Sequence, residues 1–135
     1  MKKISSLLFI TSAFFAQAQT TQTFNYTGNV QTFTVPPCVT SLTIDAKGSQ
    51  GGNVAGTTAC WTPGPVTASG GLGGRTQCTL TVTPGQVLNI YVGGINGYNG
   101  GGAAGVNGGC SSASGGVGGG ASDVRLNGVA LTDRV

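Results

Sequence analysis

Half of the residues between Gly93 and Gly120 are glycine, 14 of 28. A glycine inside regular structure costs roughly 0.5–1 kcal/mol relative to alanine, so this window alone carries a handicap of about 7–14 kcal/mol. That handicap is as large as the net stability of a whole domain, roughly 5–15 kcal/mol. The segment is therefore either disordered or part of an architecture that requires bare backbone. Both alternatives indicate a structural or binding protein outside the cytoplasm.

The first 18 residues have the three parts of an export signal. Lys2 and Lys3 form a basic start, residues 4–15 are mostly apolar, and residues 16–18 (Ala-Gln-Ala) form a small-x-small cleavage site. The apolar stretch is well short of the roughly 20 residues that span a bilayer. We therefore expect a signal peptide at 1–18 and one exported domain at 19–135, extracellular or at the cell surface, with no direct membrane span.

The charged residues exclude several classes of function. Without the leader, four basic and three acidic side chains remain, with no basic run to follow a nucleic-acid backbone. Histidine is absent, which rules out Ser-His-Asp and Cys-His catalysis. Glutamate is absent as well, so a carboxylate pair would have to come from Asp45, Asp123 and Asp133. We expect no enzyme activity, no cofactor, no metal site and no nucleic-acid partner.

Alternating apolar and polar residues predict an all-β protein. Leu42, Ile44 and Ala46 share one face of a strand, and Cys78, Leu80 and Val82 share one face of another. Turn residues then predict three hairpins, at Gly28-Asn29, at Pro84-Gly85 between the strands 76–82 and 87–92, and at Asn127-Gly128 between 124–126 and 129–131.

Four cysteines in an exported chain predict disulfides rather than a metal site: Cys38, Cys60, Cys78 and Cys110. Three connectivities are open. Strand parity favours Cys38 with Cys78, since both fall on inward faces, which leaves Cys60 with Cys110.

Two glycine-rich inserts interrupt the strands. We expect the first, 48–74, to be a surface loop held by Cys60 or a disordered segment. The second, 93–120, lacks the strict three-residue glycine period of collagen. It is suited instead to extended three-fold polyglycine chains packed through backbone N–H···O and Cα–H···O contacts.

Several short motifs, in order along the chain, resemble a family of secreted glycine-rich domains; they are residues 24–28, 31–36, 39–44, 82–86, 90–94 and 118–125. The family includes the glycine-rich extracellular domain of the anaplastic lymphoma kinase and leukocyte tyrosine kinase receptors, and bacterial secreted proteins. The resemblance implies a β-sandwich with inserts packed as polyglycine helices, and in the receptors this region binds a protein ligand. The family usually continues beyond an Asp-Arg-Val like residues 133–135, so we expect a C-terminally truncated member.

These observations predict a non-catalytic structural, adhesive or protein-binding module at the cell surface. Its partner would be a protein or a cell-surface polymer, and self-association is left open. Two alternatives remain: a fragment of a receptor-tyrosine-kinase-like ectodomain without the kinase part, and a glycan-binding module. Trp61, beside Cys60, and Tyr98, inside the glycine window, are the candidate ligand contacts. Each has a structural alternative, such as covering a disulfide. Asp123 and Arg125 are either surface charges or an anchor between the last hairpin and the glycine-rich region.

Overall fold

The computed structural model describes residues 19–58, 63–105 and 114–135. These residues confirm the all-β prediction, because they form strands and one short 3-10 helix and contain no α-helix. The elements are β1 (Gln31–Thr34), β2 (Ser41–Lys47), β3 (Val54–Thr58), β4 (Pro63–Ala68), β5 (Arg75–Thr81), β6 (Val87–Tyr91), β7 (Asp123–Leu126) and η1 (Leu131–Asp133).

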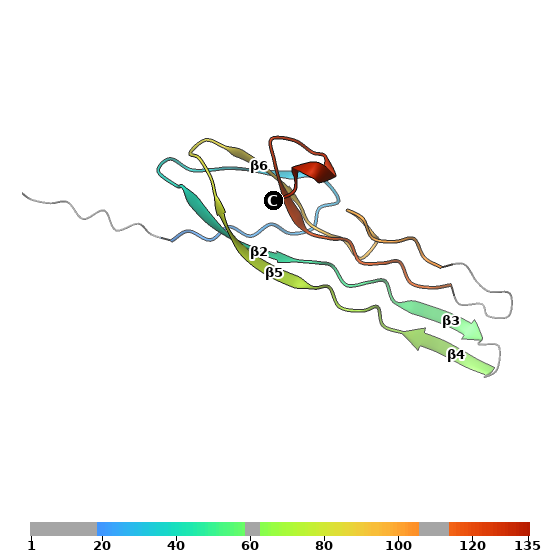
Figure 1. Cartoon of the computed structure of the whole chain (residues 1–135). Helices are drawn as coiled ribbons and strands as arrows, with labels where there is room; N and C mark the ends of the chain where they lie inside the picture. Colours follow the sequence, from blue (N-terminus) through green and yellow to red (C-terminus); the bar gives the residue numbers. More distant parts are fainter. Residues whose placement is uncertain (1–18, 59–62, 106–113) are drawn as a thin grey trace, which may run out of the picture.

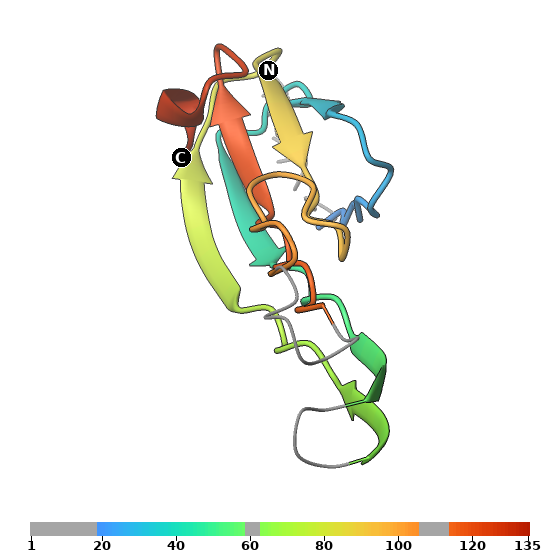
Figure 2. The same ribbon diagram turned by 90° about the vertical axis from the view of Figure 1, so that its right-hand side faces the viewer.

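Every strand pairing is antiparallel, and the strands form three sheets. β1, β6 and β7 make a three-stranded sheet in the order β1-β6-β7. β2 pairs with β5, and β3 pairs with β4. The β3–β4 hairpin projects from one end of the molecule, beyond the other two sheets (Figure 1). A view at right angles shows the same extension (Figure 2).

The pairing partners correct the three predicted hairpins. The strand after Pro84-Gly85 does not pair with the strand before it, because β5 pairs with β2 and β6 pairs with β1 and β7. This turn passes the chain from one sheet to another. No strand precedes Gly28 in the described residues. After Asn127-Gly128, residues 129–131 do not pair with β7; a bridge joins Arg134 to Arg125 instead.

The core draws on two of the sheets. Val35, Val82, Leu88 and Val124 are buried. Side chains packed against them come from both β2-β5 and β1-β6-β7 and from the connection between β1 and β2: Phe33, Val39, Leu42, Ile44, Leu80, Ile90 and Leu126. The predicted inward face of residues 42–46 is confirmed, because inner and outer positions alternate along β2. This core is small and does not reach the half of the molecule that carries the β3–β4 hairpin, so other interactions must stabilise that half.

The glycine-rich segments are ordered where they are described, and their hydrogen bonds stabilise the half of the molecule that carries the β3–β4 hairpin. We use "glycine bundle" for four chain segments, residues 48–53, 69–74, 97–105 and 114–121, which are extended except for a turn at 98–100 near the start of the third. The N–H of Gly48 donates to the carbonyl of Gly74 (2.8 Å), and that of Gly51 donates to Gly71 (2.9 Å). Further bonds also recur every third residue: Ser49 to Gly120 and Gly52 to Val117, then Gly115 to Gly105, Gly118 to Gly102 and Ala121 to Asn99. A three-residue period is that of a three-fold extended helix, whereas a β-ladder has a period of two.

Close approach explains why the bundle consists of glycine. A β-carbon at Gly70 or Gly73 would overlap the backbone carbonyl of Gly51 or Gly48. The same holds at Gly116 against Gly52, and at Gly119 against Ser49. The first insert is therefore neither a simple loop nor disordered in its described part. It is two glycine chains that lead into and out of the β3–β4 hairpin.

The expected bond between Cys38 and Cys78 is not formed, since both thiols are free and exposed. The cross-strand neighbour of Cys78 is Ile44, whereas Cys38 precedes the Ser41–Thr81 pair that begins the ladder. Three residues of β5, roughly 10 Å at 3.3 Å per residue, already separate Cys78 from that end. A disulfide needs Cα atoms within about 4.4–6.8 Å. Cys60 and Cys110 lie outside the described residues.

Candidate functional site

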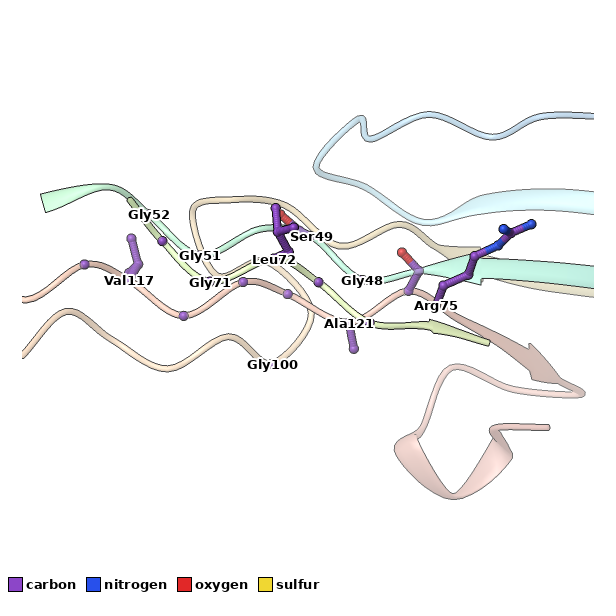
Figure 3. Close-up of a pocket in the computed structure, with 18 of the residues that line it drawn as sticks. Gly48, Ser49, Gly51, Gly52, Gly71, Leu72, Arg75, Gly100, Val117 and Ala121 are labelled. Carbon is purple, nitrogen blue, oxygen red and sulfur yellow. The ribbon is translucent and has the colours of Figure 1, made fainter. Parts of the chain in front are cut away.

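A groove of about 850 Å³ runs along the glycine bundle (Figure 3). The segment 48–53 hydrogen-bonds to 69–74 and also to 117–120, so it lies between them and forms the floor. The segments 69–74 and 116–122 form the two walls. One end of the groove opens beside Ala46 and Thr76, a cross-strand pair of the β2-β5 sheet.

Most of the groove lining is glycine backbone. A β-carbon at Gly71 or Gly74 would meet nothing within 4 Å, although both residues line the groove. Within the described part of the chain, the backbone N–H groups of residues 71–74 donate to no other backbone group. Among the described residues, the larger apolar side chains of the lining are Leu72, which is 87% exposed, Val54 and Val117. The groove therefore offers hydrogen-bond donors and close backbone approach, with little side-chain chemistry.

The groove carries almost no charge. Among the described residues that line it, Arg75 is the one with a charged side chain, and it is paired with Asp45 through Nε–Oδ1 and Nη2–Oδ2 distances of 2.7 and 2.8 Å. The hydrogen bond from Arg75 lowers the pKa of Asp45 below its usual range. Both members of this pair lie on the sheet surface, where such pairs contribute about 0–1 kcal/mol. An occupant of the groove would thus gain nothing from being charged.

A buried polar cluster fastens the bundle to the three-stranded sheet. Arg125 is only 5% exposed; its Nε bonds Asp123 (2.8 Å) and its Nη2 bonds the side-chain oxygen of Asn99 (2.7 Å). Asn99 in turn donates to Asp123 (2.8 Å) and to the carbonyl of Ala121 (2.7 Å). The Arg125 guanidinium also lies 3.7 Å from the centre of the Tyr91 ring, a cation–π contact. Of the two predicted roles for Asp123 and Arg125, the anchor is the one the structure shows.

The charges of this cluster stabilise each other. Burial alone would raise the pKa of Asp123, but hydrogen bonds from Arg125 and Asn99 and the charge of Arg134 hold it below its ordinary value. Arg134 contributes through a 2.8 Å ion pair from its Nη2. The bond to Asp123 raises the pKa of Arg125. The cluster therefore stays charged at neutral pH and holds the glycine bundle on the three-stranded sheet.

Tyr98, a predicted ligand contact, is half-buried against Tyr26. Their rings meet edge to face at 5.8 Å, and the Tyr26 hydroxyl donates to Asn96 (3.0 Å). This contact ties the segment before β1 to the second glycine-rich segment. Trp61, the other predicted contact, lies outside the described residues, so the structure does not bring the two together.

The groove was not predicted from the sequence, and neither were the contacts made by Asn99 and Tyr26. Asn99 has a φ of +64°, a left-handed conformation that asparagine tolerates, and an Asn-Gly pair inside a glycine run is the signal that could have marked it. Tyr26 lies in the segment before β1, which forms no strand. Across the described ranges, no three potential metal-binding side chains come together and no helix is long and apolar enough to cross a bilayer.

Comparison with known proteins gives no relative: no family model, no curated protein and no solved structure matches this chain.

Proposed function

We propose that this chain is an exported, non-catalytic module that has a structural or protein-binding role at the cell surface. The observation that carries the proposal is the groove, which presents bare backbone donors on a hydrogen-bonded glycine bundle. A surface of this kind recognises other polypeptide backbones, since most of its lining is glycine and its polar side chains are few and small apart from the paired Arg75. The leader-like residues 1–18 and the resemblance to secreted glycine-rich domains support export.

The architecture that we propose is a β-sandwich extended by polyglycine helices. A core with side chains from both β2-β5 and β1-β6-β7 supports the sandwich. The three-residue period of the hydrogen bonds supports polyglycine helices. In this arrangement the sandwich supplies stability, and the bundle carries the binding surface and the β3–β4 hairpin away from it.

Amide hydrogen exchange read residue by residue by NMR on the purified protein tests the bundle. We expect slow exchange at Gly48, Gly51, Gly115 and Gly118, whose N–H groups are hydrogen-bonded to other chains of the bundle. Residues 71–74 are the internal control, because their N–H groups have no backbone partner in the described part of the chain and should exchange fast. Uniformly fast exchange across all these glycines would mean a disordered segment and would remove the proposed surface.

The cellular location of the protein is tested in a separate experiment. Antibody labelling of intact cells that express the full chain should detect it at the surface or in the medium. Retention of the uncleaved chain inside the cell would contradict export and leave the exchange result unaffected.

A further inference from the structure

A second pocket lies on the three-stranded sheet, away from the glycine groove. It measures about 590 Å³ and is lined by residues 83–87, 89 and 127–128. Two turns form its walls, the turn that joins β5 to β6 and the turn that follows β7. The first of these turns is at the end of the molecule remote from the β3–β4 hairpin (Figure 1). We call this site the turn pocket, and its volume is within the roughly 300–1,000 Å³ of small-molecule sites.

The floor of the turn pocket is the outer face of β6. Leu88 is 2% exposed and belongs to the core, so its neighbours Val87 and Asn89 point to the opposite side of the sheet. Their cross-strand partners on β1, Thr34 and Thr32, are exposed on that same side. The floor and the surface beside it therefore carry amide and hydroxyl groups around a single valine.

Three carboxamide side chains surround this floor: Gln86, Asn89 and Asn127. The Oε1 atom of Gln86 accepts from the Thr83 N–H (3.1 Å), and the Nδ2 atom of Asn89 donates to the Gly128 carbonyl (2.8 Å). Because a backbone N–H only donates and a carbonyl only accepts, these bonds fix the orientation of both amides. In the described part of the chain, Nε2 of Gln86 and Oδ1 of Asn89 have no protein partner, and Asn127 is exposed. The pocket thus offers one fixed donor, one fixed acceptor and a third amide.

We infer that the turn pocket binds a neutral saccharide. A sugar hydroxyl both donates and accepts, so neighbouring hydroxyls of one ring can donate to Oδ1 of Asn89 and accept from Nε2 of Gln86. The inference goes beyond the proposed function, because the turn pocket and the glycine groove share no lining residue. Failure of saccharide binding would therefore leave the proposed function intact.

The lining of the turn pocket argues against charged and apolar ligands. None of the described residues that line it carries a charge, so an ionic ligand would lose hydration without gaining a counter-charge. The Asp133 carboxylate, which comes close to Gly128, is not part of the lining and accepts from the Ala130 N–H (2.8 Å). Val87 and Pro84 are the apolar side chains of the lining, and both are exposed, so an apolar ligand would bury little surface there. A sugar ring, which combines hydroxyl groups with a small C–H face, suits both properties.

Titration of the purified protein with saccharides, followed by two-dimensional ¹⁵N–¹H NMR, tests the inference directly. The probes are three neutral disaccharides: maltose, cellobiose and lactose. We expect at least one of them to cause saturable shifts of the side-chain amide signals of Gln86, Asn89 and Asn127, with the backbone signals of residues 48–53 unchanged. Glucuronate, which is anionic, and cyclohexanol, which has one hydroxyl on an apolar ring, should bind roughly tenfold more weakly or not at all.

Two outcomes of this titration would overturn the inference. If none of the three disaccharides shifts these amide signals, the pocket is not a saccharide site. If cyclohexanol or glucuronate binds as tightly as the best disaccharide, the pocket does not select hydroxyl groups in the way its amides require.

A matched pair of variants locates the site. Asn127→Gly removes one amide from the turn pocket without straining the backbone, because Asn127 has a φ of +61°, which glycine adopts readily. Gln77→Ala removes an exposed amide from β5, outside the pocket. Both variants should fold, which equal melting temperatures would verify. We expect Asn127→Gly to weaken disaccharide binding roughly three- to tenfold and Gln77→Ala to leave it unchanged. Equal affinity of the two variants would place the saccharide elsewhere and refute the assignment.

Discussion

The contact between two glycine chains of the bundle can be tested with one added methyl group. Gly73 packs so closely on Gly48 that a β-carbon would overlap the Gly48 carbonyl and lie 2.9 Å from the Ser49 carbonyl oxygen. Gly71 lies two residues earlier on the same segment, and a β-carbon there would meet nothing within 4 Å. Gly73→Ala and Gly71→Ala are therefore a matched pair that differ only in what the methyl group meets.

The magnitude follows from what must move. Alanine at 73 pushes residues 69–74 away from 48–53 and breaks the bonds from Gly48 to Gly74 and from Gly51 to Gly71. Each lost bond costs roughly 0.5–1.5 kcal/mol, and overpacking adds about 1–3 kcal/mol. Alanine also reduces the entropy of the unfolded chain, which returns about 0.4–1 kcal/mol. We expect Gly73→Ala to lower the free energy of unfolding by roughly 1–5.5 kcal/mol, and Gly71→Ala to leave it unchanged or raise it by up to about 1 kcal/mol.

Urea denaturation of the two variants and the parent protein, followed by circular dichroism, measures the difference. The slopes should agree among the three proteins, so that the midpoints report stability alone. Equal stability of Gly73→Ala and Gly71→Ala would mean that residues 69–74 do not pack on 48–53, and the argument for the bundle and its groove would fail with it.

Three further outcomes follow from the polar cluster and the thiols. Arg125→Ala should destabilise the protein by about 3–5 kcal/mol because it leaves Asp123 without its buried partner. Arg134→Ala, at a side chain that is 40% exposed, should cost less than about 1 kcal/mol. Thermal unfolding compares the two variants, and equal losses of stability would contradict the burial of the Arg125–Asp123 pair. The lowered pKa of Asp123 contributes stability above the pKa of an unfolded aspartate, near 3.9, that is lost as pH falls through the folded value. The melting temperature should therefore drop below about pH 4, less steeply in Asp123→Asn, and an identical pH profile in that variant would refute the role of this carboxylate. Cys38 and Cys78 should both be alkylated by iodoacetamide in the native protein, as mapped by peptide mass; protection of either thiol without denaturant would contradict its exposure.

Local sequence patterns predicted which face of a strand points inward better than they predicted which strands pair with each other. The alternation of Leu42, Ile44 and Ala46 correctly indicated which side of β2 turns inward, because that pattern depends only on the pleat. The hairpin predicted at Pro84-Gly85 was wrong because turn residues fix a change of direction and not the sheet to which the next strand belongs. At Gly28-Asn29 and Asn127-Gly128, one of the two expected strands does not form. At Pro84-Gly85 the chain crosses between sheets, and the buried positions of Val82 and Leu88 on either side of the turn make this arrangement favourable.

The candidate site was hidden for a different reason. Glycine has no side chain, so its contacts leave no hydrophobic period in the sequence, and the glycine window indicated only that bare backbone was required. The groove arises because 48–53, 69–74 and 117–120 meet, and these segments are far apart along the chain. The parity argument for Cys38 and Cys78 failed for two reasons: Cys38 lies in a turn with a left-handed φ and not on a strand face, and the register places Ile44 opposite Cys78.

The glycine bundle extends the order of a sheet without extending its core. The residue numbers of paired positions in β2-β5 add to a constant, and the same constant holds for Gly48 with Gly74, for Gly51 with Gly71, and for Val54 with Ala68 at the start of the β3–β4 hairpin. One antiparallel register thus passes from sheet to glycine chains to hairpin, while the hydrogen-bond period changes from two to three. Because glycine occupies the positions of closest approach along this path, each chain can contact neighbours on several sides, which an ordinary strand cannot do. The glycine that weakens each segment alone is therefore what allows the segments to hold one another, and it also leaves a groove with bare walls where a neighbour is missing.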